Sequence, residues 1–376
     1  MSKVGFNSAA CFSSGPTRRH PEWSLGELQG FAVGRSHRSI PAKQKLQSII
    51  DQTRGMLDIP NDYLIAIMPG SATGAMEAAM WQLLGPRCVN MHVCEVFTQL
   101  WADDLERELK LNTTVTRITR DNIPEFTDTG EDDIVLALNG TTAGFRYKNY
   151  EWLKKNRNGL VIADATSAAF CMSIEWDLFD VVAFSWQKGL GSEAAHGMLV
   201  LNPRAIERVM NYKPAWPVPR LFSLKRKDGS LNEAVFRGET LNTPSMLAVE
   251  DCLAALAWIE GKGGASWCYE QCQDNFKTLA DFIAADTRFR FAFEGEYNSP
   301  ASPCFVVQAW EDLPADARWE KYRAIGKTLE ERDVAYAIVN HAHSFPAFRF
   351  WCGPMVEGKD ITRVMHAIAA ELDREC

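Results

Sequence analysis

The sequence predicts an α/β fold in which a mostly parallel seven-stranded sheet lies between helices and is followed by a smaller α+β domain. Between residues 63 and 202, short apolar runs alternate with segments of helical pattern, and this β–α alternation favours a parallel sheet with helices on both sides. Most of the runs are continuously apolar, as is typical of strands that are covered on both faces. Beyond residue 265 the alternation ends, which indicates a second unit.

Seven apolar runs are the predicted strands of the large sheet: Tyr63–Met68, Cys88–Cys94, Thr114–Thr119, Ile134–Asn139, Leu160–Asp164, Val181–Trp186 and Met198–Leu201. The segments with helical character before and between them are Ala42–Leu57, Ala72–Leu84, Phe97–Leu109 and Tyr150–Lys155. The first of these helices is expected to end before Ile59 and Pro60, because proline cannot continue a helix.

The segment Lys213–Arg237 interrupts this rhythm, because three prolines close to Trp216 predict an extended loop rather than a regular crossover. A long helix is then expected over Pro244–Glu260, with its proline in the first turn. The glycines of Gly261–Gly264 separate it from a further helix over Ala265–Ala284.

The C-terminal part combines short strands with two helices. The predicted strands are Phe289–Phe293, Cys304–Gln308 and Ala335–Val339, and the predicted helices are Glu320–Glu331 and Ile361–Leu372. We therefore expect a large domain over residues 1–264 and a small α+β domain over residues 265–376, with the boundary placed to within about ten residues. The N-terminal segment is expected to contribute to the small domain and to a dimer.

Composition narrows the class of function. The chain has 376 residues, 46% of them apolar and 23% charged, which is ample for a packed core and argues against disorder. Its net charge is −8, and the densest cationic stretch, Leu224–Asp228, is too short for a nucleic-acid-binding face. No segment approaches the roughly 20 apolar residues of a membrane helix. We expect no nucleic acid and no membrane as partners.

Targeting and cysteine patterns indicate a cytoplasmic protein. The first residues lack the continuous apolar core of a signal peptide. The ten cysteines are scattered, and although Cys268 and Cys272 share a helix face, no second pair completes a zinc site. We therefore expect reduced thiols and no metal.

One lysine, Lys188, follows the strand-like run Val181–Trp186 and precedes Gly189 and Gly191. At the carboxyl end of a strand in an open α/β sheet, side chains face the crevice in which ligands bind. An amine that is partly desolvated there has a lowered pKa and attacks carbonyl groups to form a Schiff base. The two glycines are expected to leave room for a flat ring and a mobile turn. Taken alone, a lysine in such a position is more commonly an exposed loop lysine.

An acid ends the preceding apolar run. Asp164 closes Leu160–Asp164, 24 positions before Lys188, so the two strand ends are expected to lie side by side. A carboxylate there would hydrogen-bond a protonated pyridine nitrogen and keep the ring an electron sink, as pyridoxal phosphate requires. Capping of a following helix is the alternative role for Asp164.

Two weaker signals accompany this pair. The stretch Met68–Glu77 turns from a strand through Gly, Ser and Thr into a helix, and backbone N–H groups at a helix N-terminus bind anions. Trp101 follows a third strand. An aromatic ring at this position could stack on a cofactor ring, which stabilises binding by about 1 kcal/mol beyond the effect of the buried area. Packing in the core is the alternative role for this tryptophan.

Several motifs resemble those of the phosphoserine aminotransferases, within the fold-type I pyridoxal-phosphate aminotransferases, and the similarity runs nearly end to end. These motifs are Phe12–Pro16, Gly34–Ser39, Asp164–Ser167, Ser185–Lys188, Gly238–Pro244 and Arg349–Gly353. The resemblance implies pyridoxal 5'-phosphate as the cofactor, with Lys188 holding it as a Schiff base and Asp164 pairing with the pyridine nitrogen.

The resemblance also assigns the remaining contacts. It implies that Trp101 stacks on the cofactor ring and that Thr141 hydrogen-bonds near the ring hydroxyl. The cofactor phosphate would be held by Ser71, Ala72 and Gln187. Asn242 and Thr243 would reach the same phosphate from a neighbouring subunit. The protein would therefore be a homodimer with shared active sites.

For the substrate, Arg349 would bind the α-carboxylate in the bidentate manner that arginine favours. His37 and Arg38 would bind the substrate's own phosphate across the dimer interface. The chain differs from the family in the segment just before Arg349. Many family members carry a further arginine in this segment, whereas this chain has His341 and His343. Histidines would hold a phosphate more weakly and with more pH dependence, or they are ordinary polar residues at a strand end.

The implied reaction is ping-pong transamination between glutamate and 3-phosphohydroxypyruvate, which gives 2-oxoglutarate and O-phospho-L-serine for serine biosynthesis. The altered stretch at His341 and His343 keeps open a second reading, in which the same fold and cofactor serve an unphosphorylated acceptor, as in serine–pyruvate or alanine–glyoxylate transamination, or a lyase reaction. A binding or scaffold protein without cofactor is the third reading.

Overall fold

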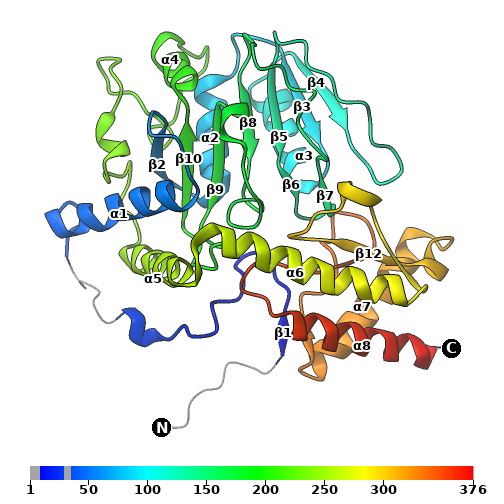
Figure 1. Cartoon of the computed structure of the whole chain (residues 1–376). Coiled ribbons are helices and arrows are strands. Elements are labelled where there is room, and N and C mark those ends of the chain that lie inside the picture. Colours follow the sequence, from blue (N-terminus) through cyan, green and yellow to red (C-terminus); the bar gives the residue numbers. More distant parts are fainter. Residues whose placement is uncertain (1–8, 29–34, 376) are drawn as a thin grey trace.

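The computed structural model describes residues 9–28 and 35–375, and its largest element is a seven-stranded sheet (Figure 1). The strand order is β2-β10-β9-β8-β5-β3-β4. The strands are β2 (Leu64–Pro69), β3 (Val89–Val93), β4 (Thr113–Arg117), β5 (Asp133–Ala137), β8 (Val161–Asp164), β9 (Val181–Ser185) and β10 (His196–Leu201). All neighbouring pairs are parallel except those of β10, which runs antiparallel to β2 and β9. The predicted sheet is thus confirmed, strand by strand.

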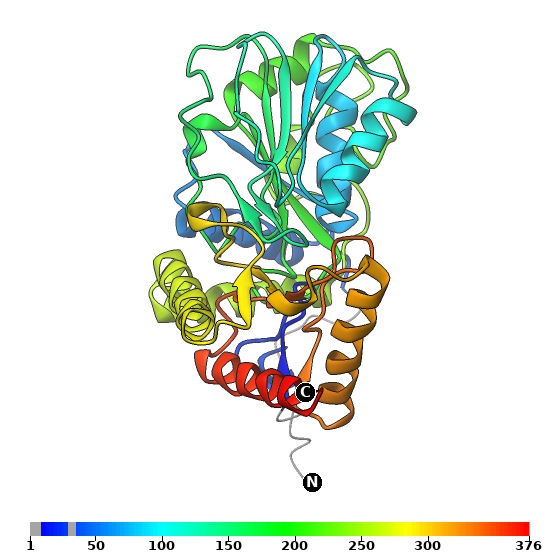
Figure 2. The same ribbon diagram turned by 90° about the vertical axis from the view of Figure 1, so that its right-hand side faces the viewer.

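Helices cover both faces of this sheet, as Figure 2 shows from the side. On one face lie α2 (Ser71–Leu83), α3 (Val96–Asp103) and α4 (Pro203–Asn211), which share one apolar core with inward side chains of the strands. On the other face, α1 (Ile40–Met56), α5 (Met246–Lys262) and the start of α6 (Gly264–Ala285) contribute to a second core. Strands buried on both sides need continuously apolar sequence, which is the pattern that identified them.

The helix that was predicted from Pro244 begins two residues later. Ser245 caps α5, because its Oγ accepts a hydrogen bond from the Ala248 N–H at 3.3 Å. Pro244 therefore precedes the cap and does not lie in the first turn. At the other end, Gly263 has a φ of 119° and closes α5, and α6 begins at the next residue.

The predicted helix over Tyr150–Lys155 is wrong, because this segment forms turns. Its aromatic residues instead pack sideways into a cluster, with Tyr150 5.4 Å from Tyr147 between ring centroids. The N–H of Lys154 donates to Asp128 at 2.9 Å, which takes it out of a helical pattern. The helix predicted over Phe97–Leu109 is present in two parts, α3 and a π-helical turn over Asp104–Glu108.

The C-terminal part contains a three-stranded antiparallel sheet, in the order β11-β12-β14, flanked by helices. Its elements are β11 (Phe289–Phe291), β12 (Cys304–Val307), β14 (Phe348–Arg349), α7 (Ala315–Glu331) and α8 (Gly358–Glu375). The short strand β13 (Ala335–Tyr336) pairs in parallel with β1 (Ala10–Cys11), so the N-terminal segment lies against this part of the chain. The domain boundary near residue 265 stays a prediction.

The remaining elements are short. A hairpin of β6 (Asn139–Gly140) and β7 (Phe145–Arg146) follows β5. Short 3-10 turns lie at Leu25–Leu28, Trp176–Leu178, Glu233–Phe236, Gly295–Tyr297 and Gln308–Trp310. The segment Lys213–Arg237 is mostly loop, as predicted from its prolines.

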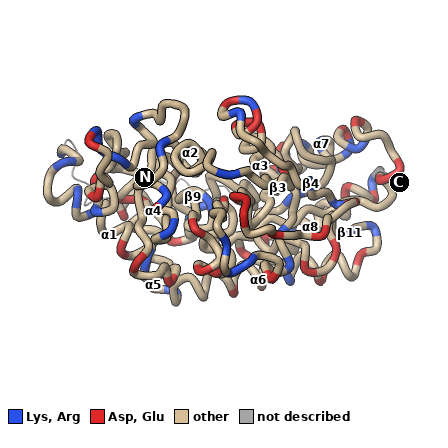
Figure 3. The backbone as a smooth tube through the Cα atoms, turned by 90° about the horizontal axis from the view of Figure 1, so that it is seen from above, with Lys and Arg blue, Asp and Glu red and all other residues tan. Residues whose placement is uncertain are grey.

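Charged residues of both signs are interspersed along the chain in the view from above (Figure 3). This distribution agrees with the absence of a long basic run in the sequence. Among the described helices, we find none that is long and apolar enough to cross a membrane.

Candidate active site

Lys188 and Asp164 lie in one cavity at the carboxyl edge of the large sheet. Strands β8 and β9 are parallel neighbours, with Asp164 opposite Ala183, and Lys188 lies three residues beyond the end of β9. The cavity has a volume of about 240 Å³. It is lined from the ends of β2, β3, β5, β8 and β9, which agrees with the rule that open α/β sheets bind ligands at this edge.

The Lys188 side chain is buried, with 8% of its surface exposed. Burial lowers the pKa of its amine to about 8, and the nearby carboxylate of Glu95 opposes this effect. The N-terminal segment holds the backbone here, because the Thr17 hydroxyl donates to the Lys188 carbonyl at 2.9 Å. Lys188 is therefore not an exposed loop lysine, and its amine has an unusually large neutral fraction near neutral pH.

The glycines after Lys188 serve close packing. A Cβ on Gly189 would lie 2.3 Å from the Ala169 carbonyl oxygen, and a Cβ on Gly191 would lie 2.7 Å from the Met355 side chain. The expectation that they leave open room is therefore wrong. The residue that leaves room for the lysine is Gly15, where a Cβ would lie 3.3 Å from Cε of Lys188.

Asp164 receives hydrogen bonds on both carboxylate oxygens. Trp101 Nε1 donates to Oδ2 at 3.2 Å, and the Thr166 N–H donates to Oδ1 at 2.9 Å, with the Thr166 hydroxyl as a further donor. The residues that follow form turns, so Asp164 does not cap a helix. Its side chain is 7% exposed and lines the cavity, where it can still meet a cationic nitrogen.

The turn between β2 and α2 forms an anion cradle. Gly70 and Ser71 adopt φ values of 79° and 57°, and the left-handed conformation at Ser71 is uncommon for a residue with a side chain. Ser71, Ala72 and Thr73 line the cavity at the start of α2, where the first N–H groups have no partner within the helix. Gly197 on β10 allows the start of α2 to lie close to the sheet, because a Cβ at this position would lie 2.2 Å from the Ser71 carbonyl oxygen.

Gln187 completes the fit to a phosphorylated pyridine cofactor. It lines the cavity, and its buried Oε1 has no hydrogen-bond partner. An amide oxygen only accepts hydrogen bonds, so the Nε2 donors of Gln187 are the atoms that suit a phosphate, and Oε1 remains available to a donor group of a ligand. With the α2 cradle, the Asp164 carboxylate and the Lys188 amine, the cavity offers a group for each polar end of pyridoxal phosphate.

Thr141 lies in the same cavity within a hydrogen-bonded group. Its hydroxyl donates to Ser167 Oγ at 2.7 Å, and Asn139 Nδ2 donates to the same oxygen at 2.8 Å. The Asn139 Oδ1 atom is buried without a hydrogen-bond partner, so it can still accept a hydrogen bond from a ligand in the cavity.

Arg349 on β14 lies close enough to Lys188 to lower the pKa of its amine. The guanidinium is buried, Nη1 donates to the Phe12 carbonyl at 3.3 Å, and Nε has no partner. A buried cation with a free donor is suited to a carboxylate ligand. His341 is exposed beside it, and the Phe97 ring lies 6.4 Å from His341 and 5.7 Å from Lys188 Nζ.

Besides Arg349, His341 and His343, four residues assigned by resemblance do not line the Lys188 cavity of the same chain: His37, Arg38, Asn242 and Thr243. The first two immediately precede α1, and the last two precede α5, which packs on α1. Arg38 and Thr243 are exposed. Their contacts with a cofactor or substrate stay predictions.

The sequence reasoning missed three residues near the lysine. Glu95 and Phe97 line the cavity at the start of α3, and Gly15 lies on the Lys188 side chain. Glu95 had a signal, because it directly follows a predicted strand at the edge where Asp164 and Lys188 were expected. Gly15 belongs to the motif Phe12–Pro16, but the motif does not indicate its place beside Lys188, because only the fold brings residues that distant in sequence together.

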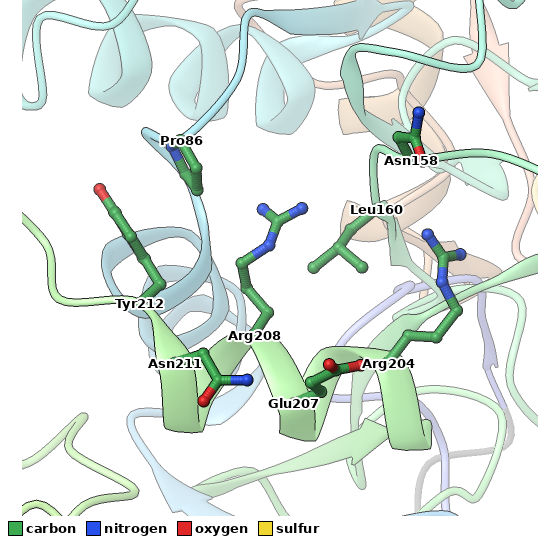
Figure 4. A pocket seen from close by; sticks show the side chains of 8 residues that line it. All are labelled: Pro86, Asn158, Leu160, Arg204, Glu207, Arg208, Asn211 and Tyr212. Atoms are coloured by element: carbon green, nitrogen blue, oxygen red, sulfur yellow. The ribbon is translucent and has the colours of Figure 1, made fainter.

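A second hollow lies at the opposite edge of the sheet, beside α4 (Figure 4). Its two arginines suggest an anion site, but both are already satisfied. Arg204 donates to Asp180 and to two carbonyls, and Arg208 donates to Asp133 and the Leu83 carbonyl. These arginines therefore serve the structure.

Comparison with known proteins gives concordant results. No protein-family model matches the chain. A phosphoserine aminotransferase of Methanosarcina barkeri is 44% identical over 354 residues, which cover 93% of this chain and 93% of that relative. A solved phosphoserine aminotransferase from Cytophaga hutchinsonii has a TM-score of 0.80 at 18% identity and covers 97% of this chain and 99% of that one. The pyridoxal-phosphate-bound phosphoserine aminotransferase of Trichomonas vaginalis has a TM-score of 0.76 at 17% identity, with coverages of 95% and 99%. At these identities the two solved structures confirm the predicted fold class.

Proposed function

The chain belongs to the phosphoserine aminotransferase family, and on this premise we propose that its Lys188 cavity binds pyridoxal 5'-phosphate and catalyses transamination. The amino group of glutamate passes to 3-phosphohydroxypyruvate, which gives 2-oxoglutarate and O-phospho-L-serine, a step of serine biosynthesis. The observation that carries this proposal is the meeting of Lys188, Asp164 and the α2 cradle in one cavity. We also infer a cytoplasmic location, as the sequence predicts.

When bound, pyridoxal phosphate supplies an aldehyde that condenses with amines and a ring that delocalises the electrons released at the substrate's α-carbon. Lys188 would hold the cofactor, and its buried amine in the neutral form can take up the proton from that carbon. Asp164 would hold the ring nitrogen in its protonated state. The N-terminus of α2 and Gln187 would hold the phosphate, and Thr141 would hydrogen-bond near the ring hydroxyl.

Arg349 binds the substrate's α-carboxylate, which its unsatisfied Nε and its burial support. Charge-assisted hydrogen bonds to a buried guanidinium are strong, and they would orient the α-carbon toward Lys188. The His341 ring lies 6.4 Å from that of Phe97, which lines the cavity, and 5.6 Å from that of His343, and this proximity supports a contact with the distal end of the substrate.

A homodimer completes the site. His37 and Arg38 for the substrate phosphate, and Asn242 and Thr243 for the cofactor phosphate, come from the neighbouring subunit. Support comes from their position beside α1 and α5, outside the cavity of their own chain. Exposed apolar residues at the same helices, Ile40 at 73% and Leu247 at 52% exposure, also suit an interface.

A substrate comparison tests this function. The cofactor-loaded chain is assayed with glutamate as donor and with 3-phosphohydroxypyruvate, glyoxylate or pyruvate as acceptor. We expect the largest kcat/KM for 3-phosphohydroxypyruvate. A preference for glyoxylate or pyruvate would overturn the phosphorylated substrate and favour the alternative that His341 and His343 raise.

A further inference from the structure

Glu95 is a carboxylate in the Lys188 cavity to which the proposed function assigns no role. It lies between β3 and α3. Its Oε2 accepts hydrogen bonds from the N–H and the hydroxyl of Thr142, at 2.6 and 3.0 Å. The Thr142 carbonyl in turn accepts from Ser344 Oγ at 2.9 Å. Glu95 is thus fixed in orientation by a residue that the C-terminal part of the chain also holds.

Of the charged groups around Lys188, Glu95 has the strongest electrostatic effect on the pKa of its amine. The groups that act on its amine are Glu95, Asp164, Arg349 and the thiol of Cys171. Asp164 already accepts hydrogen bonds on both oxygens, and Arg349 repels a second cation. After burial, Glu95 has the largest effect on the amine, and it opposes the lowering of the pKa.

The interaction is reciprocal. Burial raises the pKa of Glu95 to about 7, while the Thr142 hydrogen bonds and the Lys188 charge lower it. Asp164 acts in the opposite direction, because a second anion disfavours ionisation of the first. Within the described chain, Glu95 and Lys188 form no direct ion pair at 4.0 Å or less. The amine therefore has a partner for its charge without being tied to it.

We propose that Glu95 sets the protonation state of the Lys188 amine, as a half-buried carboxylate that lines the same cavity and that Thr142 holds in place. Glu95 is a positioning residue in this role, because it acts through Lys188. A lysine that alternates between holding a cofactor and moving a proton needs both its charged and its neutral form, and a nearby counter-charge keeps the charged form accessible against the cost of burial. This inference rests on the proposed function only in one respect, namely that the protonation state of Lys188 matters for transamination.

Competitive labelling of the cofactor-free chain with trace acetic anhydride tests the proposal. Only the neutral amine reacts, so the acetylated fraction of the Lys188 peptide, measured by mass spectrometry across pH, gives the titration midpoint. Glu95→Gln keeps the shape and the acceptor oxygen for Thr142 but removes the charge. We expect its midpoint to fall by about one pH unit, the usual effect of losing one nearby opposite charge.

Glu77→Gln is the matched control, because Glu77 is a half-buried carboxylate on α2 that does not act on Lys188. We expect it to leave the Lys188 midpoint unchanged. An unchanged midpoint in a folded Glu95→Gln chain, or an equal shift in Glu77→Gln, would overturn the proposal.

The unmutated chain provides a second test that does not require the variant to fold. If Glu95 and Lys188 interact, the labelling of Lys188 rises less steeply with pH than for a single independent group, because Glu95 ionises in the same range. A simple one-proton curve would contradict the coupling. Both measurements are independent of turnover, so loss of the proposed transamination would leave them unaffected.

Discussion

Trp101 donates its indole Nε1–H to Oδ2 of Asp164 at 3.2 Å, across the cavity edge formed by α3 and β8. The indole is 3% exposed and packs in the core beside α2. Trp101 was predicted to stack on a cofactor ring, and the structure adds a polar role through its edge. Asp164 is thereby held with one oxygen on Trp101 and the other on Thr166.

Trp101→Phe should weaken cofactor binding, because it keeps an apolar ring and removes the hydrogen bond that orients Asp164. We expect a loss of about 1 kcal/mol, or roughly fivefold in the dissociation constant of pyridoxal phosphate. Titration of the cofactor-free chain followed by absorbance measures it. An unchanged dissociation constant would show that the hydrogen bond does not orient the acid.

Gly15→Ala should impair Lys188 while the fold is retained. The added Cβ would lie 3.3 Å from Lys188 Cε and 3.4 Å from Gln187 Cγ, so the lysine must shift. Misplacement of a reacting group is expensive, and we expect kcat to fall on the order of tenfold. Gly261→Ala in α5 is the control, since nothing lies within 4 Å of its Cβ. If both variants match the unmutated chain, Gly15 does not limit Lys188.

Mixed dimers test the shared site. Lys188→Ala and Arg38→Ala chains are each expected to be poorly active with 3-phosphohydroxypyruvate. If Arg38 serves the neighbouring subunit's Lys188, a mixed dimer has one intact site and one doubly defective site. We therefore expect activity to reappear after the two chains are unfolded and refolded together. No recovery, with mixed dimers demonstrated by a tag on one chain, would place Arg38 outside the partner's site.

The lowered pKa of Lys188 predicts a pH-dependent stability of the cofactor-free chain. The folded pKa is about 8, below the unfolded value of roughly 10.4. Below pH 8 the amine is protonated in both states, so the full cost of burying its charge is present; above about pH 10.4 it is neutral in both, and this cost is absent.

Lys188→Met should therefore stabilise the cofactor-free chain, by about 1–3 kcal/mol below pH 8. The gain should shrink as pH rises from 8 toward 10. Urea unfolding of both chains at several pH values measures it. A gain that is constant across this range would mean that the buried amine is not the cause.

Sequence periodicity predicted the large sheet well because most of its strands, such as β5, β8 and β9, are almost continuously apolar and fully buried. It failed at Tyr150–Lys155, where aromatic packing and a hydrogen bond to Asp128 override helical character. It also missed β14, whose two residues are a strand only because β12 lies beside them. Local pattern cannot report a contact made by residues distant in sequence.

The residues of the candidate site also fall into those that the sequence could predict and those that it could not. Lys188, Asp164 and Ser71 could be predicted because strand ends of a parallel sheet meet at one edge. The role of Gly15 could not, since its neighbour Lys188 is far along the chain. The sequence shows the glycines after Lys188 but not their packing role, because the Ala169 carbonyl that requires Gly189 lies in another segment.

The most direct test of the central claim is to find the residue that carries the cofactor. The chain is loaded with pyridoxal phosphate, reduced with borohydride, digested and analysed by mass spectrometry. The account predicts that the phosphopyridoxyl group is on Lys188 and that the cofactor's visible absorbance is lost on reduction. Attachment at another lysine, or no attachment to a folded chain, would contradict it.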